Sequence, residues 1–246
     1  MNDFIGQINL FPYFDTLPLL NWLKCNGENA SIEDYSALYS LIGTTFGGDG
    51  TTTFATPDLP FAGSDDLHYF IAAFGIYPDP QQQTFNSYTG QICLFPYDFS
   101  PTGWLGCDGS GQSIKSYNDL YSIIGTIFGG DGSTTFNLPN LASPDGGKIK
   151  YYISTKGISP AQGVTTAMEI HIGQIGLFPF GISCDSWMEC NGALLDIDAN
   201  EAFFTLIGIS FGGDGFNNFA VPNLPSPDGG KSKYFISSDG IYPMLS

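Results

Sequence analysis

The chain has 246 residues, of which 42% are hydrophobic and only 13% are charged, and its formal net charge is −17. All seven cationic residues are lysines, so the sequence lacks the mixed lysine and arginine clusters that hold nucleic-acid backbones. The same composition argues against arginine clamps on phosphates and against binding to anionic lipid surfaces. No apolar run reaches the roughly 18 residues that a membrane span needs. We therefore expect neither a nucleic-acid partner nor membrane insertion.

Three copies of one pattern organise the sequence. Each copy opens with a short segment in which apolar residues alternate with polar or small ones, at residues 5–12, 89–96 and 172–179. This alternation predicts a β-strand. The closing proline of each segment, at positions 12, 96 and 179, predicts its end, because proline has no N–H for another ladder bond.

A Trp-x-x-Cys-Asn/Asp-Gly motif follows each of these segments, and its last two residues predict a turn. The motif residues are Trp22 and Cys25, Trp104 and Cys107, and Trp187 and Cys190. The tryptophans could stack on sugars, but beside a turn and a cysteine we favour packing in the core. We interpret the three equivalent cysteines as small buried hydrophobes. A bridge between Cys184 and Cys190 is an alternative in an oxidising compartment, and spacing alone leaves it open.

The only helical pattern of each unit comes next. Apolar side chains recur at i, i+3, i+4 and i+7 in residues 35–42 and 117–124, with a related pattern in residues 200–207. Ser116 and Asp119 resemble a weakened capping box, and a glycine at position 43, 125 or 208 is placed to end each helix. A helix of about nine residues does not stand alone, so we expect its apolar face to pack on the strands.

A glycine-rich loop follows each helix, and ten residues separate its first glycine from a proline in every copy. The loop residues are Gly47, Gly48, Asp49, Gly50 and Pro57; Gly129, Gly130, Asp131, Gly132 and Pro139; and Gly212, Gly213, Asp214, Gly215 and Pro222. The loop lacks the following lysine of a phosphate cradle and comes after a helix. We predict a tight turn in which the aspartate caps its own backbone. The same aspartates are minor candidates for calcium ligands, although we expect no metal and no cofactor.

Each unit closes with another apolar segment, which begins at His68, Lys150 or Lys233 and predicts a strand. We place the units at residues 1–80, 88–160 and 171–246, joined by linkers at 81–87 and 161–170. The expected fold class is α+β and rich in strands.

Taken together, these motifs resemble the phage tail collar domain family, which includes the so-called microcystin-dependent proteins of bacteria. The second unit carries them most completely, in residues 90–96, 103–109, 124–132 and 136–141. The resemblance implies a part of a tail fibre or tail tip that assembles in threes and has no agreed enzymatic activity. The sequence departs from the family in two places: no fibre shaft precedes Ile5, and residues 60–63 and 142–145 replace the usual Arg-Gly-Arg-type stretch.

The chain also differs in supplying three copies itself. We therefore expect a single-chain pseudo-trimer, in which three tandem collar-like repeats surround a pseudo-threefold axis. The three repeats would then bury within one chain the contact surfaces that the relatives bury between three chains. A linear string of beads is the alternative.

The first functional hypothesis is a non-enzymatic structural subunit of an extracellular appendage that assembles head to tail into a fibre or filament. Its partner would be another copy of itself, joined by strand addition through residues 1–5 and 234–246. The alternative is a phage tail-tip or surface adhesin that binds cell-surface glycan through exposed aromatics such as Tyr13, Tyr97 and Phe180.

Catalysis is the hypothesis that the sequence favours least. The only histidines, His68 and His171, stand at non-equivalent positions of their units. No Gly-x-Ser-x-Gly elbow supplies a serine nucleophile, so we expect no enzyme. The sequence shows no recognisable signal peptide. An extracellular location, which we expect, is compatible with release by lysis, with a route that uses no cleaved signal, and with a chain that has already been processed.

Overall fold

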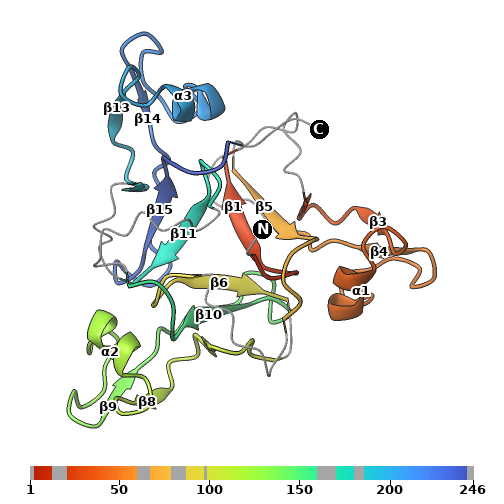
Figure 1. The fold of residues 1–246 in the computed structure, drawn as a ribbon, viewed down its shortest axis with the longest axis vertical. Coiled ribbons are helices and arrows are strands. Elements are labelled where there is room, and N and C mark those ends of the chain that lie inside the picture. Colours follow the sequence, from red (N-terminus) through yellow and green to blue (C-terminus); the bar gives the residue numbers. More distant parts are fainter. Residues whose placement is uncertain are drawn as a thin grey trace.

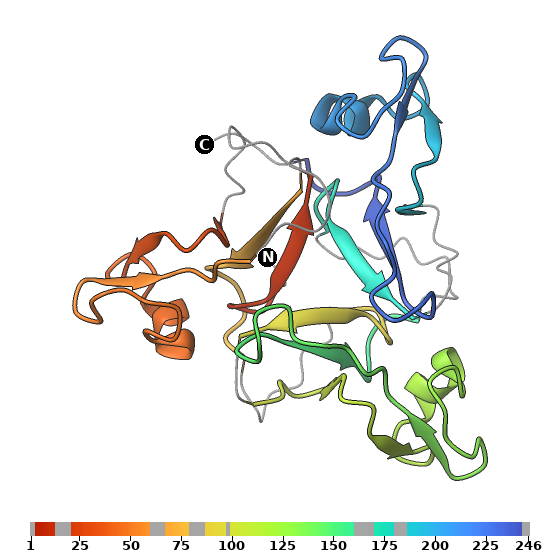
Figure 2. The same cartoon turned by 180° about the vertical axis from the view of Figure 1, so that it is seen from behind.

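The structure is a computed structural model that describes residues 3–12, 21–59, 67–78, 87–96, 99–159, 170–179 and 186–242. Three equivalent units surround a common axis, and each sends an arm outward from a central group of strands (Figure 1). The view from behind shows the same three arms (Figure 2). The expected pseudo-trimer of three repeats is confirmed, and the string of beads is wrong.

Three inner strands form a triangle around the axis (Figure 1). They are β1 (Ile8–Phe11), β6 (Ile92–Phe95) and β11 (Ile175–Phe178). Each meets both others through one antiparallel residue pair, in which a leucine of one unit faces an isoleucine of another. The pairs are Leu10 with Ile175, Leu94 with Ile8, and Leu177 with Ile92. The same contact thus repeats around the axis and closes the three units into a ring.

Each inner strand belongs to a three-stranded antiparallel group of its own unit. Its neighbours are β5 (His68–Ala72), β10 (Lys150–Ser154) and β15 (Lys233–Ser237). The outer edge is formed by β2 (Trp22–Lys24), β7 (Trp104–Gly106) and β12 (Trp187–Glu189). The predicted opening and closing segments are therefore hydrogen-bonded neighbours, and each opening strand ends before its proline, as expected.

Each arm combines the helix with a pair of antiparallel strands; the helix and the glycine-rich loop connect the two strands, and we call each pair the arm hairpin. The hairpins are β3 (Asn29–Ser31) with β4 (Thr53–Ala55), β8 (Gly111–Ser113) with β9 (Thr135–Asn137), and β13 (Leu194–Asp196) with β14 (Asn218–Ala220). The helices are α1 (Ser36–Ile42), α2 (Asn118–Ile124) and α3 (Glu201–Ile207), each with 7 residues. They are shorter than expected, because the first residue of each predicted pattern is the N-cap rather than part of the helix.

The helix ends test two expectations. The C-terminal glycines have positive φ, for example +51° at Gly125, whose N–H donates to the carbonyl of Tyr121, so the predicted helix stop is confirmed. The capping box is wrong: Tyr117 precedes α2, and no side chain caps the helix. The N–H of Ser116 instead donates to the carbonyl of Ser113 in the turn before it.

The terminal segments are not free for strand addition over their described parts, so this expectation is wrong there. Ile5 donates its N–H to the carbonyl of Ile76, and Ile76 donates to Asp3. At the other end, β15 lies between β11 and β12, and Ile241 bridges to His171. Among the described residues, no helix is long and apolar enough to cross a membrane.

Candidate functional site

The Gly-Gly-Asp-Gly loop is a turn closed by its aspartate. In the second unit, one carboxylate oxygen of Asp131 accepts the backbone N–H groups of Ser133, Thr134 and Thr135 at 2.8, 2.7 and 2.8 Å. The other oxygen accepts the hydroxyl of Thr134 at 2.6 Å. Asp49 and Asp214 each accept the three equivalent backbone N–H groups in their own turns. The carboxylate supplies the acceptors that this tight turn needs.

These hydrogen bonds favour the ionised aspartate. The hydroxyl of Thr134 and the three backbone N–H groups hold the pKa of Asp131 well below its ordinary value, although the side chain is exposed. A metal ion would have to displace these donors, and the three aspartates lie on three different arms. Within the described ranges, no group of three His, Cys, Asp or Glu residues is placed to hold a metal.

The second position of the loop requires glycine for two reasons, the space around it and its backbone conformation. Gly130 has φ of +100°, and a Cβ there would lie 2.4 Å from the Cα of Phe136. Gly48 and Gly213 are equally tight against Phe54 and Phe219. The loop thus passes directly against the hairpin strand that follows it, and only glycine fits.

The motif tryptophans are inside the molecule, each 5% exposed. Each packs edge-to-face on the phenylalanine of its own inner strand, with ring centroids 5.3 Å apart for Phe95 and Trp104. The equivalent pairs, Phe11 with Trp22 and Phe178 with Trp187, lie at 5.4 Å. Buried rings cannot stack on a sugar, so the packing interpretation fits the structure.

The motif cysteines Cys25, Cys107 and Cys190 are buried free thiols, as is Cys93. Burial raises the pKa of Cys107 well above its ordinary value, which keeps the sulfur protonated and unreactive. Cys184, the partner of Cys190 in the alternative bridge, lies outside the described residues. The glycan candidates Tyr13, Tyr97 and Phe180 also lie outside them.

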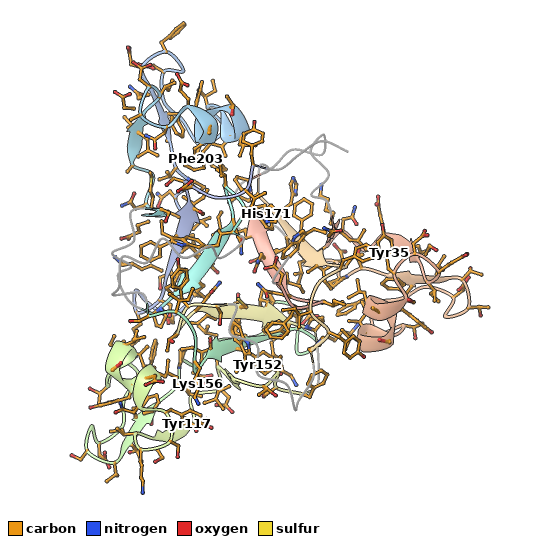
Figure 3. The ribbon with its side chains drawn as sticks, viewed as in Figure 1. Tyr35, Tyr117, Tyr152, Lys156, His171 and Phe203 are labelled. Atoms are coloured by element: carbon orange, nitrogen blue, oxygen red, sulfur yellow. The ribbon has the colours of Figure 1, made fainter. Side chains whose placement is uncertain are left out.

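One residue from the start of each unit packs into the aromatic core of the next unit; we call these the docking residues. Phe4 contacts Phe95 of unit two, with centroids 6.2 Å apart, and Tyr88 contacts Phe178 of unit three at 6.1 Å. His171 of unit three contacts Phe11 of unit one at 6.3 Å, which closes the circle. His171 lies beside the inner strands, whereas Tyr117 and Phe203 lie on the arms (Figure 3).

The docking residues were missed from the sequence because a phenylalanine, a tyrosine and a histidine share no motif. All three are less than 9% exposed. The burial of His171 in this contact places it in the structural core of the ring. Each unit therefore completes the core of its neighbour.

Lysines make a second contact between units. The ammonium of Lys148 in unit two lies 5.5 Å from the ring centroid of Phe46 in unit one and donates to the carbonyl of Thr45. Lys231 of unit three lies 5.6 Å from the ring centroid of Phe128 in unit two. Both phenylalanines precede the Gly-Gly-Asp-Gly loop, so the lysines tie one arm to the next unit through cation–π contacts.

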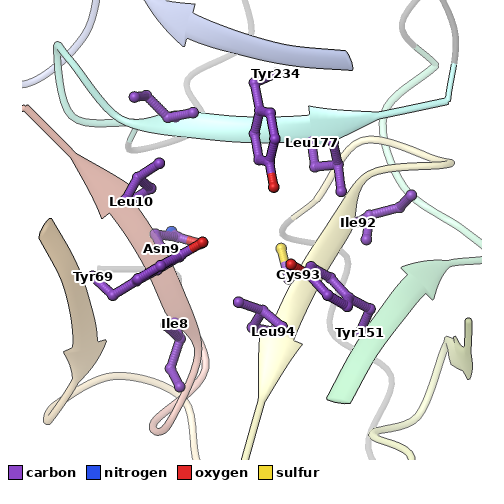
Figure 4. A pocket seen from close by; sticks show the side chains of 11 residues that line it. Ile8, Asn9, Leu10, Tyr69, Ile92, Cys93, Leu94, Tyr151, Leu177 and Tyr234 are labelled. Carbon is purple, nitrogen blue, oxygen red and sulfur yellow. The ribbon is translucent and has the colours of Figure 1, made fainter. Parts of the chain in front are cut away.

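The axis itself holds a cavity of about 30 Å³, lined by three equivalent tyrosines and the inner strands. The hydroxyls of Tyr69, Tyr151 and Tyr234 point toward one another (Figure 4). Burial raises the pKa of Tyr69 and Tyr234, which keeps these phenols protonated, and Tyr151 and Tyr234 share a hydrogen bond. A space of this size suits a bound water rather than a substrate.

Exposed apolar side chains are unevenly distributed over the three arms. The arm of unit three exposes Leu194 (61%), Ile209 (57%) and Phe216 (88%). The equivalent positions are Asn29, Thr44 and Thr51 in unit one and Gly111, Thr126 and Ser133 in unit two. The arm of unit two exposes only Ile127 (45%) in this class, so among the described residues the third arm is the most apolar at its surface.

Comparison with known families identifies the repeats. The model of the phage tail collar domain matches residues 6–60, 90–144 and 173–226, which together make up more than half of the chain. Each match begins at the glycine that precedes an inner strand and includes the arm, so the sequence resemblance is confirmed. Neither the curated proteins nor the solved structures gave a match.

Proposed function

The chain belongs to the phage tail collar domain family, and we propose that it is a non-enzymatic structural subunit of an extracellular appendage of the tail-fibre type. The observation that carries the proposal is the closed ring of three collar repeats, joined by the docking residues. A chain that forms the threefold ring by itself can enter a larger assembly without first forming a trimer. The four described cysteines and the three tryptophans are buried in the packing of the units.

We further propose that the ring assembles head to tail into a filament. A ring with pseudo-threefold symmetry has two different ends, because no twofold axis exchanges them. Contact between one end and the opposite end of the next copy is heterologous, and such contacts generate open fibres when they do not close. The partner of the chain in this proposal is a second copy of itself.

Exposed apolar residues after the closing strands support this contact. Tyr77 follows β5 and Tyr242 follows β15 at equivalent positions, so the pseudo-symmetry gives both the same height along the axis. Phe74 and Ile241 belong to the same two segments, and all four side chains are between 43% and 49% exposed. These side chains are the apolar surface that we propose for the contact between copies.

Negative-stain electron microscopy of the purified chain tests the assembly. We expect filaments from the wild type and single rings from a Phe74→Ser, Ile241→Ser double variant, because the apolar contact is then removed. The Leu194→Ser variant, which changes a still more exposed apolar residue on an arm (61%), is the control and should still form filaments. Uniform single rings of the wild type under all conditions would contradict the proposal.

Glycan binding by a tail-tip or surface adhesin is the second candidate function. The aromatic residues that the sequence suggests for glycan binding lie outside the described residues. A groove that extends from unit two to unit three offers another place for a sugar.

A further inference from the structure

Two adjoining cavities form a groove on unit two that extends to unit three. The larger, about 520 Å³, lies beside the motif turn of unit two and is lined by Asp108, Asn140 and Lys150 among others. The smaller, about 360 Å³, is lined by Phe128 and Asn140 of unit two and by Lys231 of unit three. Asn140 borders both, so the two cavities lie side by side. Each volume lies in the range of roughly 300–1,000 Å³ typical of small-molecule sites.

The polar groups of the groove offer both donors and acceptors. Asn140 is exposed, and its amide makes no side-chain hydrogen bond within the described part of the chain. Hydrogen bonds from Ser110 lower the pKa of Asp108, so its carboxylate is ionised and accepts hydrogen bonds. An amide next to a carboxylate can pair with neighbouring hydroxyls of one ligand.

Phe128 and Lys231 form the end of the groove next to unit three. The ring of Phe128 is partly exposed and carries the ammonium of Lys231 above it. Lys231 makes no hydrogen bond within the described residues, whereas its equivalent Lys148 donates to the carbonyl of Thr45 at 3.0 Å. The ammonium between units two and three therefore remains available to a ligand, while the equivalent ammonium between units one and two is already used.

From this arrangement we infer that the groove between units two and three binds a short neutral oligosaccharide. Sugar hydroxyls donate to Asp108 and accept from Asn140 and Lys231, and apolar C–H groups of a sugar ring lie against the exposed edge of Phe128, beside the ammonium that covers its face. This specifies the ligand class for the second candidate function, and the inference rests on that function rather than on filament assembly.

The charge of the molecule decides between ligand classes. The chain carries a formal charge of −17, so an acidic glycan or an acidic peptide is repelled by the molecule as a whole, while Asp108 and Asp228 border the groove itself. The two lysines that line the groove balance these carboxylates locally. A neutral ligand with many hydroxyls satisfies the same groups without adding charge.

Isothermal titration calorimetry with the full chain tests the site. The probes are trisaccharides of glucose, of galactose and of N-acetylglucosamine, with a trisaccharide of galacturonic acid as the acidic comparison. We expect saturable binding of at least one neutral trisaccharide at one site per chain. The Asn140→Ala and Phe128→Ala variants should each weaken it at least tenfold, because one removes the hydroxyl contact and the other the apolar surface.

The matched controls are Asp58→Ala and Phe46→Ala, which change the equivalent positions of unit one and should leave the affinity unchanged. Circular dichroism verifies that each variant is folded. Because Asn140 is exposed, the Asn140→Ala variant still tests the site if Phe128→Ala destabilises the ring. The inference is overturned if no neutral trisaccharide binds, if the acidic one binds tightest, or if the unit-one variants weaken binding equally. Filament images of the same samples report separately on assembly.

Discussion

At the residue scale, the aspartate of the Gly-Gly-Asp-Gly turn has the same geometry in all three units. Asp49, Asp131 and Asp214 each bind three successive backbone N–H groups of their own loops. The sequence predicted this turn, because an aspartate between glycines has few other ways to satisfy so short a loop. It could not predict the close approach to the hairpin, which depends on strands that come together only in the fold.

Removing the carboxylate in Asp131→Ala should lower the melting temperature at pH 7, because the three N–H groups lose their acceptor. The folded pKa is depressed, so the stabilisation is present above the unfolded pKa of about 3.9 and is lost as the pH falls through the folded pKa. Thermal unfolding at decreasing pH should therefore show the wild type and the variant converging in acid. Ser133→Ala keeps the backbone donor and should match the wild type; a gap between Asp131→Ala and wild type that does not depend on pH would refute this account.

At the scale of the element, the seven-residue helix depends on its packing. Leu120 and Ile124 of α2 are buried at 0% exposure in a cluster with Phe136 of the hairpin. No side chain caps the helix, and a helix of this length gains too little from its own hydrogen bonds to persist. Its stability therefore comes from the hairpin that it covers.

The Leu120→Ala variant should lose about 2–5 kcal/mol of unfolding free energy, since the cavity forms in a fully buried place. Chemical denaturation followed by tryptophan fluorescence measures this loss. Ser122→Ala changes an exposed residue of the same helix and should stay within about 0.5 kcal/mol of the wild type. A loss in Leu120→Ala no larger than that in Ser122→Ala would contradict the view that packing holds the helix, because alanine does not lower helix propensity at either position.

Only some of the elements could be predicted from the sequence. The opening strands and the helices were predicted, because their apolar residues follow the periods of 2 and 3.6. The arm hairpins were not, since strands such as Asn29–Ser31 have three residues and no buried side chain to mark them. The groove was also out of reach: Phe128 and Lys231 are brought together by the ring and by no local pattern.

At the scale of the whole molecule, the docking residues join the units. Phe4→Ala should cost about 3–5 kcal/mol, because it empties the contact with Phe95 in unit two. Phe4→Tyr should be tolerated, since Tyr88 fills the equivalent place in the next joint. Urea unfolding measures both, and Phe74→Ala, on an exposed ring of the same unit, should cost less. If Phe4→Ala were no worse than Phe74→Ala, the joint would not stabilise the ring.

The single chain also removes a constraint that a homotrimer obeys. Three identical subunits must carry identical arms, whereas here the third arm alone exposes Leu194, Ile209 and Phe216. The two lysine contacts differ in the same way, because only Lys148 is tied to a backbone carbonyl. Covalent linkage thus keeps the threefold architecture and lets each unit acquire its own surface.

The closing contact between His171 and Phe11 has a consequence for synthesis of the chain. The core of unit one, which is made first, receives its docking residue only after 170 residues have been translated. Contacts between residues so distant in sequence form slowly, because a long loop must close before they contribute. The aromatic core of the first unit therefore stays incomplete during synthesis. We expect the packing of unit three against unit one to be the last step of folding.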